Sequence, residues 1–328
     1  MIVVTGGAGF IGSCLVEALE RHGLGELVVC DRLGRDDKWR NIAKRALADI
    51  VPPEQLLDWL DRHAGSVELI YHLGAVSSTV ETDADLIVDS NFRLTMALWA
   101  WCARHGTRLV YASSAATYGD GSAGFDDASD PLSLARLRPL NAYGWSKHLT
   151  DRRIVALDAS GAPRPPQWAG LKFFNVYGPN EYHKGGQRSV VPQLWSQVRE
   201  TGRARLFRSY RPDYPDGGQL RDFVWVDDAV AVMLWLGGHP EVSGLFNVGS
   251  GRARSFADLA RAVFQAMGRA EAIEFVDMPE ALRDRYQYYT CASLDRLRAA
   301  GCPLQTTSLE EGVRRYVQDH LEAHDPYR

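Results

Sequence analysis

The stretch Thr5-Gly6-Gly7-Ala8-Gly9-Phe10-Ile11-Gly12 decides the fold of this chain. It follows an apolar run over residues 1–5, which predicts a buried strand, and it leads into a segment with helical spacing. Glycines at a strand-to-helix turn let a pyrophosphate approach the backbone N–H groups, where a Cβ would block it. We therefore predict that Gly6, Gly9, Phe10, Ile11 and Gly12 bind a dinucleotide; the alternative is a glycine-rich turn without a ligand.

Short apolar runs alternate with helical segments through the first half of the chain. We expect further strands at residues 27–30, 68–72, 108–112 and 171–174, and helices at residues 83–105 and 142–159. Strands that alternate with helices are typical of βαβ units, which stack into a parallel sheet. The sequence therefore predicts an α/β fold with a Rossmann-like, doubly wound parallel sheet.

The alternation loosens after Gly178, which indicates a second, smaller α/β lobe that binds the substrate. Residues 161–167 hold three prolines and a glycine and predict a surface connection, and residues 211–218 predict a loop. Strands are expected again at 224–226 and 245–248. We assign residues 1–175 plus 222–249 to the dinucleotide-binding domain, and residues 176–221 plus 250–328 mainly to the substrate-binding lobe.

Composition narrows the class of protein. The chain has 328 residues, 45% of them hydrophobic, and a formal net charge of -4, so it lacks the basic field that nucleic acid needs. Its five cysteines are scattered without a C-x-x-C pair, which favours reduced thiols over a zinc ribbon or a disulfide framework. The first residues form a strand with no charged leader, and no apolar run could span a bilayer. We expect a cytoplasmic protein with no membrane or nucleic-acid partner.

The cofactor's adenosine ribose has a predicted partner in Asp31, about twenty residues after the glycine loop, where an acid accepts hydrogen bonds from the hydroxyls. That carboxylate alone favours NAD. Arg32 and Lys38 follow it, and cations there pair with the 2′-phosphate of NADP. We predict NADP, with NAD possible and a solvated charged loop as the alternative.

Further cofactor contacts are expected along the sheet's carboxyl edge. Asp49, between the second and third expected strands, could meet the adenine amino group or lie on the surface. The small residues Gly74 and Ala75, with Leu73, follow the third expected strand and would let a dinucleotide lie against the backbone. The predicted cofactor-binding set is completed by Asn91, in the expected helix 83–105, and by Tyr143 and Lys147 in the expected helix 142–159.

The chemistry is predicted to reside in Ser114, after the expected strand 108–112, and in Tyr143 and Lys147 at the start of the expected helix 142–159. A Tyr-x-x-x-Lys spacing places both side chains on one helical face. An ammonium beside a phenol favours the phenolate, so Tyr143 could act as a base below its free pKa while Ser114 polarises the reacting oxygen. The motif alone is weak, but the glycine loop and Ser114 make a chance match the minor explanation.

These residues together resemble the extended short-chain dehydrogenase/reductase family, and the resemblance covers essentially the whole chain. The family's catalytic Ser, Tyr and Lys match Ser114, Tyr143 and Lys147. Members that dehydrate sugars usually carry Asp-Glu near the serine, whereas this chain reads Ala115-Ala116-Thr117. The resemblance therefore disfavours a dehydratase.

A narrower resemblance is to the family's branch of ADP-heptose 6-epimerases. It rests on the start of the chain and on Y-A-S-S-A-A-T-Y-G (111–119), F-F-N-V-Y-G-P-N-E-Y-H-K-G (173–185), R-D-F-V-W-V (221–226) and R-Y-Q (285–287). It implies inversion at C6″ of ADP-D-glycero-manno-heptose by transient oxidation with tightly bound NADP. It also implies that Tyr143 and Lys184 are the two acid/base groups, that Lys38 faces the 2′-phosphate, and that the enzyme is a homo-oligomer.

The substrate contacts expected on the same basis are Ser114, Asn175, His183, Arg221 and Tyr286. Arg221 could pair with the diphosphate or form an interlobe salt bridge, and Asn175 could cap a turn instead. We expect His183 to pack or to position the ligand, because no partner ligands are spaced near it for a metal. The chain departs from the branch in its longer loop at residues 208–219 and in Arg32, which replaces a neutral residue.

Two rival functions remain open at this level. Another nucleotide-sugar enzyme, such as a UDP-hexose 4-epimerase or a sugar reductase, would share Ser114, Tyr143 and Lys147 but would not need Lys184. A non-catalytic dinucleotide-binding sensor or scaffold would not need Ser114, Tyr143 and Lys147, so their presence argues against it.

Overall fold

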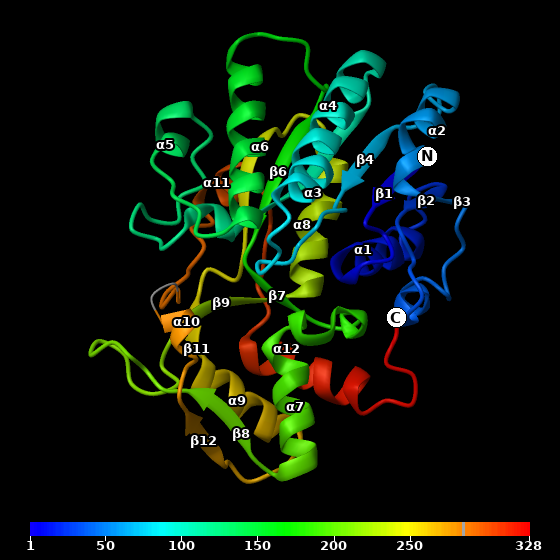
Figure 1. The fold of residues 1–328 in the computed structure, drawn as a ribbon. Coiled ribbons are helices and arrows are strands. Elements are labelled where there is room, and N and C mark those ends of the chain that lie inside the picture. Colours follow the sequence, from blue (N-terminus) through cyan, green and yellow to red (C-terminus); the bar gives the residue numbers. More distant parts are fainter. Residues whose placement is uncertain (284–285) are drawn as a thin grey trace.

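A seven-stranded parallel sheet forms the centre of the molecule (Figure 1). The structure, a computed structural model, describes residues 1–283 and 286–328. In spatial order the strands are β10 (Gly244–Val248), β6 (Trp168–Phe173), β5 (Arg108–Ser114), β4 (Leu69–His72), β1 (Ile2–Thr5), β2 (Leu27–Cys30) and β3 (Asp49–Val51). Every neighbouring pair is parallel, which confirms the predicted doubly wound α/β fold.

Several predicted boundaries differ from the structure. Residues 49–51, expected between strands, form the edge strand β3, and β6 begins at Trp168, three residues before the expected 171. The strand expected at 224–226 ends at Trp225, because β9 (Leu220–Trp225) passes directly into α8 (Val226–Gly238). The helix expected at 83–105 is α3 (Ala84–Ile87), a π-helical turn at Val88–Arg93 and α4 (Leu94–His105). α6 (Ala142–Ala159) has the predicted bounds.

The register brings the functional segments to one edge of the sheet. Thr5, the last residue of β1, is level with Cys30 of β2 and His72 of β4. The chain runs outward from β1 to β2 and β3, and then crosses back to place β4 on the other side of β1. This reversal leaves a crevice outside the carboxyl ends of β1 and β4, which is where such sheets bind ligands.

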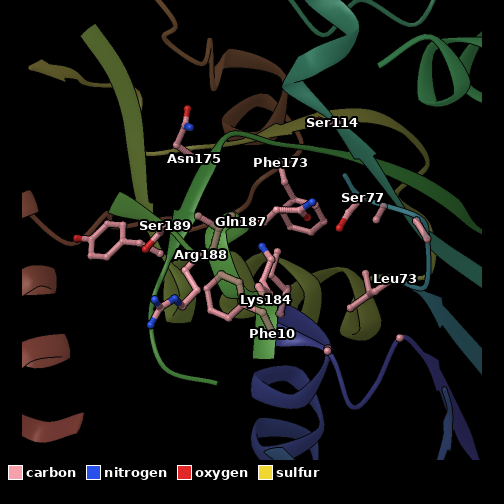
Figure 2. Close-up of a pocket in the computed structure, with 18 of the residues that line it drawn as sticks. Phe10, Leu73, Ser77, Ser114, Phe173, Asn175, Lys184, Gln187, Arg188 and Ser189 are labelled. Atoms are coloured by element: carbon pink, nitrogen blue, oxygen red, sulfur yellow. The ribbon is translucent and has the colours of Figure 1, made fainter. Parts of the chain in front are cut away.

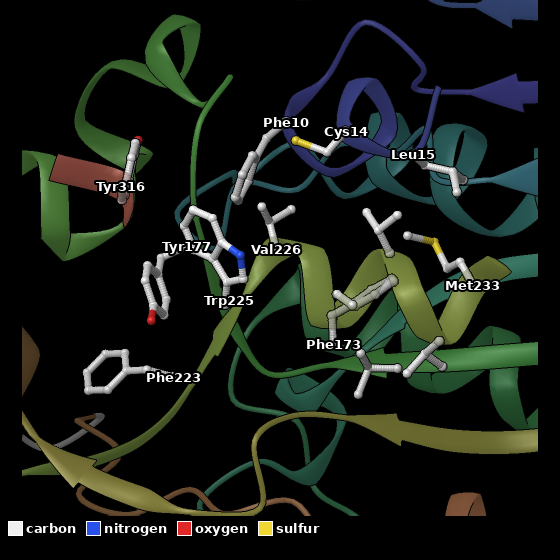
Figure 3. Packing of buried hydrophobic residues seen from close by; sticks show 14 of the residues in the cluster. Phe10, Cys14, Leu15, Phe173, Tyr177, Phe223, Trp225, Val226, Met233 and Tyr316 are labelled. Atoms are coloured by element: carbon white, nitrogen blue, oxygen red, sulfur yellow. The ribbon is translucent and has the colours of Figure 1, made fainter. Parts of the chain in front are cut away.

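Both faces of the sheet are buried, so its strands are apolar throughout. In β1, Val4 joins a core with α1 (Phe10–Arg21) and α8, while Val3 joins a second core with α2 (Leu56–Arg62), α4 and α6. Figure 3 shows the α1 and α8 side chains packing against each other. Each fully buried aliphatic side chain contributes about 1.5–3 kcal/mol, so these two cores hold the carboxyl edge of the sheet in place.

The remaining elements gather largely on one side of the sheet (Figure 1). They include a three-stranded sheet, β11 (Ala253–Ser255), β9 and β7 (Asn175–Tyr177), and a two-stranded sheet, β12 (Ile273–Val276) and β8 (Ala204–Phe207). The helices are α7 (Val190–Thr201), α9 (Phe256–Ala266), α10 (Glu280–Arg283), α11 (Asp295–Ala299) and α12 (Leu309–Tyr316), with the short α5 (Pro131–Ala135) beside α6. Apart from α5 and α11, which contact α6 and β10 beside the large sheet, these elements make up the smaller α/β part. Its division from the large sheet at the predicted residues stays a prediction.

Within residues 1–283 and 286–328, no helix has both the length and the apolar character that crossing a membrane requires.

Candidate active site

A cavity of about 780 Å³ opens at the carboxyl edge of the large sheet. The glycine loop and α1 line it on one side, and the segment from His183 to Val191 lines it on the other. Ser114, Tyr143 and Lys147 lie between these walls, and Figure 2 shows Phe10, Ser114 and Lys184 around the same space. Segments far apart in the sequence therefore meet in one cavity.

The glycine loop fits a dinucleotide through close backbone packing. A Cβ on Gly12 would lie 2.1 Å from the Gly6 carbonyl oxygen, and a Cβ on Gly6 would lie 2.6 Å from the Gly74 nitrogen. Gly9 caps α1 without a side-chain hydrogen bond, so N–H groups of the first helical turn stay available to an anion. Gly6, Gly9, Phe10, Ile11 and Gly12 all line the cavity, as do Leu73, Gly74 and Ala75 across the crevice.

Asp31 and Lys38 face the cavity as an ion pair. The Lys38 Nζ lies 2.6 Å from Asp31 Oδ1, and Asp31 Oδ2 accepts a hydrogen bond from the Ala8 N–H over 3.0 Å. The carboxylate is thus tied to the glycine loop, and its charge is compensated by an amine. Arg32 points elsewhere: it is exposed and its Nε donates to Glu54 Oε1 over 2.7 Å.

Besides Arg32, two residues predicted to bind the cofactor, Asp49 and Asn91, lie outside the lining of this cavity. Asp49 accepts a hydrogen bond from the Trp59 indole over 2.8 Å and lies at the edge strand β3. Asn91 is fully buried and exchanges hydrogen bonds of 2.8 and 2.9 Å with the Val76 backbone. Its amide also donates to Ser146 Oγ over 3.0 Å. Asn91 therefore holds the loop after β4 against α6, which carries Tyr143 and Lys147.

Ser114, Tyr143 and Lys147 meet at the centre of the cavity because β5 ends where α6 begins. Asn141 caps α6 by accepting the Gly144 N–H over 2.8 Å, which fixes the first helical turn. Tyr143 and Ser114 both line the cavity, and the Lys147 Nζ donates to the Ala112 carbonyl over 2.8 Å. Lys147 is 2% exposed, and burial lowers its pKa to about 8.

The pKa of Tyr143 was expected to be lowered, but in the structure it is raised. Burial raises the pKa of Tyr143, and this effect exceeds the lowering by the Ser114 hydrogen bond; the Asp151 charge raises it further. The reason is that the phenol is removed from water while Lys147 directs its amine to a backbone carbonyl. In the chain alone, Tyr143 is therefore a protonated acid at neutral pH.

The comparisons with known proteins agree with this geometry. The model of the NAD dependent epimerase/dehydratase family matches residues 2–249. The chain belongs to this family. A relative from Nitratidesulfovibrio vulgaris (strain DP4), named ADP-L-glycero-D-manno-heptose-6-epimerase, is 49% identical over 330 residues and spans 100% of both chains.

Solved structures of the epimerase/dehydratase family share the whole architecture. The Helicobacter pylori ADP-L-glycero-D-manno-heptose-6-epimerase is 25% identical with a TM-score of 0.77, covering 97% of this chain and 95% of that chain. The UDP-glucose 4-epimerase of Thermus thermophilus, solved in complex with NAD, is 25% identical with a TM-score of 0.75, covering 98% of this chain and 99% of that one. The resemblance to the extended short-chain dehydrogenase/reductases is thereby confirmed.

Lys184 of this epimerase/dehydratase lies on the 3₁₀ helix η5 (Tyr182–Gln187) and lines the cavity. Its Nζ is 5.6 Å from the centre of the Phe10 ring, and its side chain has no hydrogen bond or ion pair with the residues that the structure describes. Burial lowers the pKa of Lys184, although the charge of Glu181 opposes this. An amine with these properties can exchange protons with a bound ligand.

The other expected substrate contacts divide into two groups. His183 and Asn175 line the cavity. Arg221 and Tyr286 lie outside its lining and contact each other, with the guanidinium carbon 5.2 Å from the Tyr286 ring centre and 5.7 Å from that of Phe256. Arg221 forms no salt bridge with any described residue. The salt bridge between the two lobes, which was the alternative role for Arg221, is therefore not observed among these residues. Arg285 of the R-Y-Q segment lies outside the described residues.

Several lining residues were missed by the sequence analysis. Ser77 and Thr79 lie on one wall, while Gln187 and Arg188 lie on the other. Gln187 Nε2 donates to Ser78 Oγ over 2.8 Å, which connects the two walls. The proximity of Arg188 to the H-K-G segment was the available signal, but loop residues show no periodicity that would indicate which side chain faces a ligand.

Proposed function

We propose that this chain inverts C6″ of ADP-D-glycero-manno-heptose, with NADP as a tightly held cofactor and with Tyr143 and Lys184 as acid/base groups. The observation that carries the proposal is the second amine, Lys184, in the same cavity as Ser114, Tyr143 and Lys147. A full-length relative named for this reaction supports it.

Two acid/base groups suit an inversion at an unactivated carbinol carbon. The C–H bond there is too weakly acidic for direct proton removal, and the bound oxidised nicotinamide supplies a reversible hydride acceptor. One group of the pair Tyr143 and Lys184 takes the hydroxyl proton as the ketone forms. The ketone must then turn its other face, so its oxygen meets a different donor, and the second group returns a proton. The proton and hydride removed are both restored, so there is no net redox change.

Ser114 and Lys147 hold this site ready for reaction. Ser114 lines the cavity together with Tyr143 and acts to lower the pKa of the phenol, although burial raises that pKa more. The buried Lys147 keeps a positive charge within one helical turn of the phenol below its pKa of about 8. That charge stabilises the phenolate that forms when Tyr143 gives up its proton.

We infer NADP as the preferred cofactor from the Asp31–Lys38 pair. A free Asp31 carboxylate would repel a 2′-phosphate, but Lys38 lies 2.6 Å from it and supplies a compensating charge. The exposed Arg32 adds little to this argument because Glu54 already pairs with it. We also infer a homo-oligomer, by analogy with related enzymes; light scattering of the purified protein tests it.

The test is proton NMR of the purified enzyme with ADP-D-glycero-β-D-manno-heptose. The wild type should form the L-glycero epimer, Lys184→Ala should slow conversion at least about a hundredfold, and the matched surface variant Arg164→Ala should retain full activity. Arg164 is exposed and pairs only with Asp158 in the described structure. No conversion by the wild type, with NADP⁺ and NAD⁺ supplied, contradicts the proposal. That result would favour a 4-epimerase or reductase, and panels of UDP- and GDP-sugars would then identify the substrate. Undiminished conversion by Lys184→Ala contradicts the acid/base role of Lys184.

A further inference from the structure

The segment that carries Lys38 and the segment that carries Lys184 are joined behind the cavity by Asn41. Asn41 ends the 3₁₀ helix η1 (Asp37–Asn41) and is 1% exposed. Its amide nitrogen lies 2.8 Å from the Ala8 carbonyl, 2.9 Å from the Asn180 carbonyl and 3.3 Å from His183 Nδ1. One side chain thus connects the glycine loop, the Lys38 segment and the Lys184 segment.

Residues 325–328 cover the same junction from outside. Figure 1 shows this part of the chain, in red, returning to the blue N-terminal region. The Tyr327 ring lies edge-on to Tyr182, with centroids 5.2 Å apart, and the Arg40 guanidinium lies 4.6 Å from the Tyr327 ring centre. Tyr182 donates to the Pro326 carbonyl over 3.1 Å. The segment therefore contacts both η1 and η5.

Charged contacts fix the two ends of this segment. The Lys44 Nζ lies 2.8 Å from Asp325 Oδ2 and donates to the Tyr327 carbonyl over 2.6 Å. Arg328 is largely buried and pairs with Asp227 at 2.5 Å. Its backbone N–H donates over 3.2 Å to Asn180, which lies directly before the η5 segment.

The position of Lys184 depends on contacts that its neighbours in the sequence make. Its amine has no polar partner among the described residues, and the backbone that follows it is held locally, by the Arg188 Nε donating to the Gly185 carbonyl over 2.9 Å. Gln187 connects the end of η5 to Ser78, and the start of η5 is held by the contacts of three residues, Glu181, Tyr182 and His183. Two of these three residues contact Asn41 or residues 325–328.

We propose that Asn41 and residues 325–328 form a clasp that couples dinucleotide binding at the glycine loop and Lys38 to the placement of Lys184. Cofactor bound against the glycine loop and Lys38 orders η1, and the clasp passes that order to η5. The coupling is reciprocal, so an ordered η5 also slows release of the cofactor. The role of Lys184 as an acid/base rests on the proposed function, whereas the coupling does not.

Hydrogen–deuterium exchange of the cofactor-free protein, with and without NADP⁺, tests the clasp. In the wild type, NADP⁺ should slow exchange in peptides that cover residues 5–16 and also in those that cover 181–188. In Tyr327→Ala the first effect should persist, while the second should shrink at least about fivefold and NADP⁺ should dissociate at least about fivefold faster. Tyr327→Phe, which keeps the ring, should behave as the wild type.

Two further variants keep the test decisive. Asn41→Ala should show the same loss; because it removes buried hydrogen bonds and could impair folding, Tyr327→Ala carries the conclusion in that case. Tyr289→Ala, an exposed tyrosine away from the clasp, is the matched control and should change neither readout.

The clasp is overturned if NADP⁺ fails to protect residues 181–188 in the wild type, or if Tyr327→Ala shows undiminished protection and unchanged release. Neither readout uses a sugar. Failure of the wild type to convert the ADP-heptose would contradict the proposed function and leave these outcomes interpretable.

Discussion

Adding one methyl group at Gly12 should damage the cofactor site more than any single surface change. The Cβ of Gly12→Ala would lie 2.1 Å from the Gly6 carbonyl oxygen and 2.8 Å from the Gly6 carbonyl carbon. Both atoms belong to the backbone, so relief requires the glycine loop to move away from α1 by roughly 1 Å, since carbon atoms in contact prefer about 3.5–4.0 Å. Overpacking of this kind costs about 1–3 kcal/mol.

The same displacement should weaken the dinucleotide more than it weakens the fold. Loss of one hydrogen bond to a charged phosphate costs about 1.5–3 kcal/mol, which corresponds to a rise of about ten- to one-hundredfold in the dissociation constant. Tm should fall by about 2–6 °C. We would measure NADP⁺ affinity by calorimetry and Tm by circular dichroism.

Gly65→Ala is the matched control, because a Cβ there meets nothing within 4 Å. It should leave both quantities unchanged. A Gly12→Ala protein with the wild-type affinity for NADP⁺ and the wild-type Tm would refute the steric reasoning. A lower Tm with unchanged affinity would show that the packing of the loop matters for stability but not for cofactor binding.

Three other perturbations test the surroundings of the site. Lys38→Ala should raise the dissociation constant of NADP⁺ at least about tenfold more than that of NAD⁺, because Asp31 then faces the 2′-phosphate alone; calorimetry showing equal changes would contradict the assigned role. Lys172 and Asp151 form a fully buried ion pair of 2.9 Å. Lys172→Met should therefore lower the free energy of unfolding by about 3–5 kcal/mol, and adding Asp151→Leu to that variant should recover part of the loss. If urea unfolding shows that the losses of the two substitutions simply add, the buried pair is not the cause. Burial raises the pKa of Asp127 to about 6, above its usual value near 4, so the folded state holds more protons and the free energy of unfolding should fall as pH rises from about 4 to about 6. Asp127→Asn should remove this fall. If the free energies of unfolding of the two proteins, measured in urea between pH 4 and 7, change in parallel with pH, Asp127 is not its source.

The large sheet could be predicted because its signals are local. Buried parallel strands are continuous apolar runs, and the turn after β1 needs glycine for reasons that concern only neighbouring backbone atoms. Strand β3 was missed because an edge strand of three residues carries little apolar signal, and its Asp49 and Ile50 are exposed. Boundaries at β6 and β9 shifted because pairing with neighbouring strands, not propensity, decides where a strand begins and ends.

The catalytic residues could be proposed from spacing and resemblance, but their environments could not. The pKa of Tyr143 depends on how far the phenol is removed from water, and that is set by the packing of α6 on β5. Arg32 and Lys38 look equivalent in sequence, yet one pairs with Glu54 at the surface and the other with Asp31 in the cavity.

By itself the sequence determined the fold class, the position of the glycine loop and the choice of Ser114, Tyr143 and Lys147 as candidate catalytic residues, because each depends on residue type and short-range spacing. Only the tertiary structure decided that Lys184 shares their cavity and that Asn41 and residues 325–328 join η1 to η5. The Asn41–His183 and Tyr182–Tyr327 contacts link residues more than a hundred positions apart, and no local periodicity records which distant surfaces a folded chain brings together.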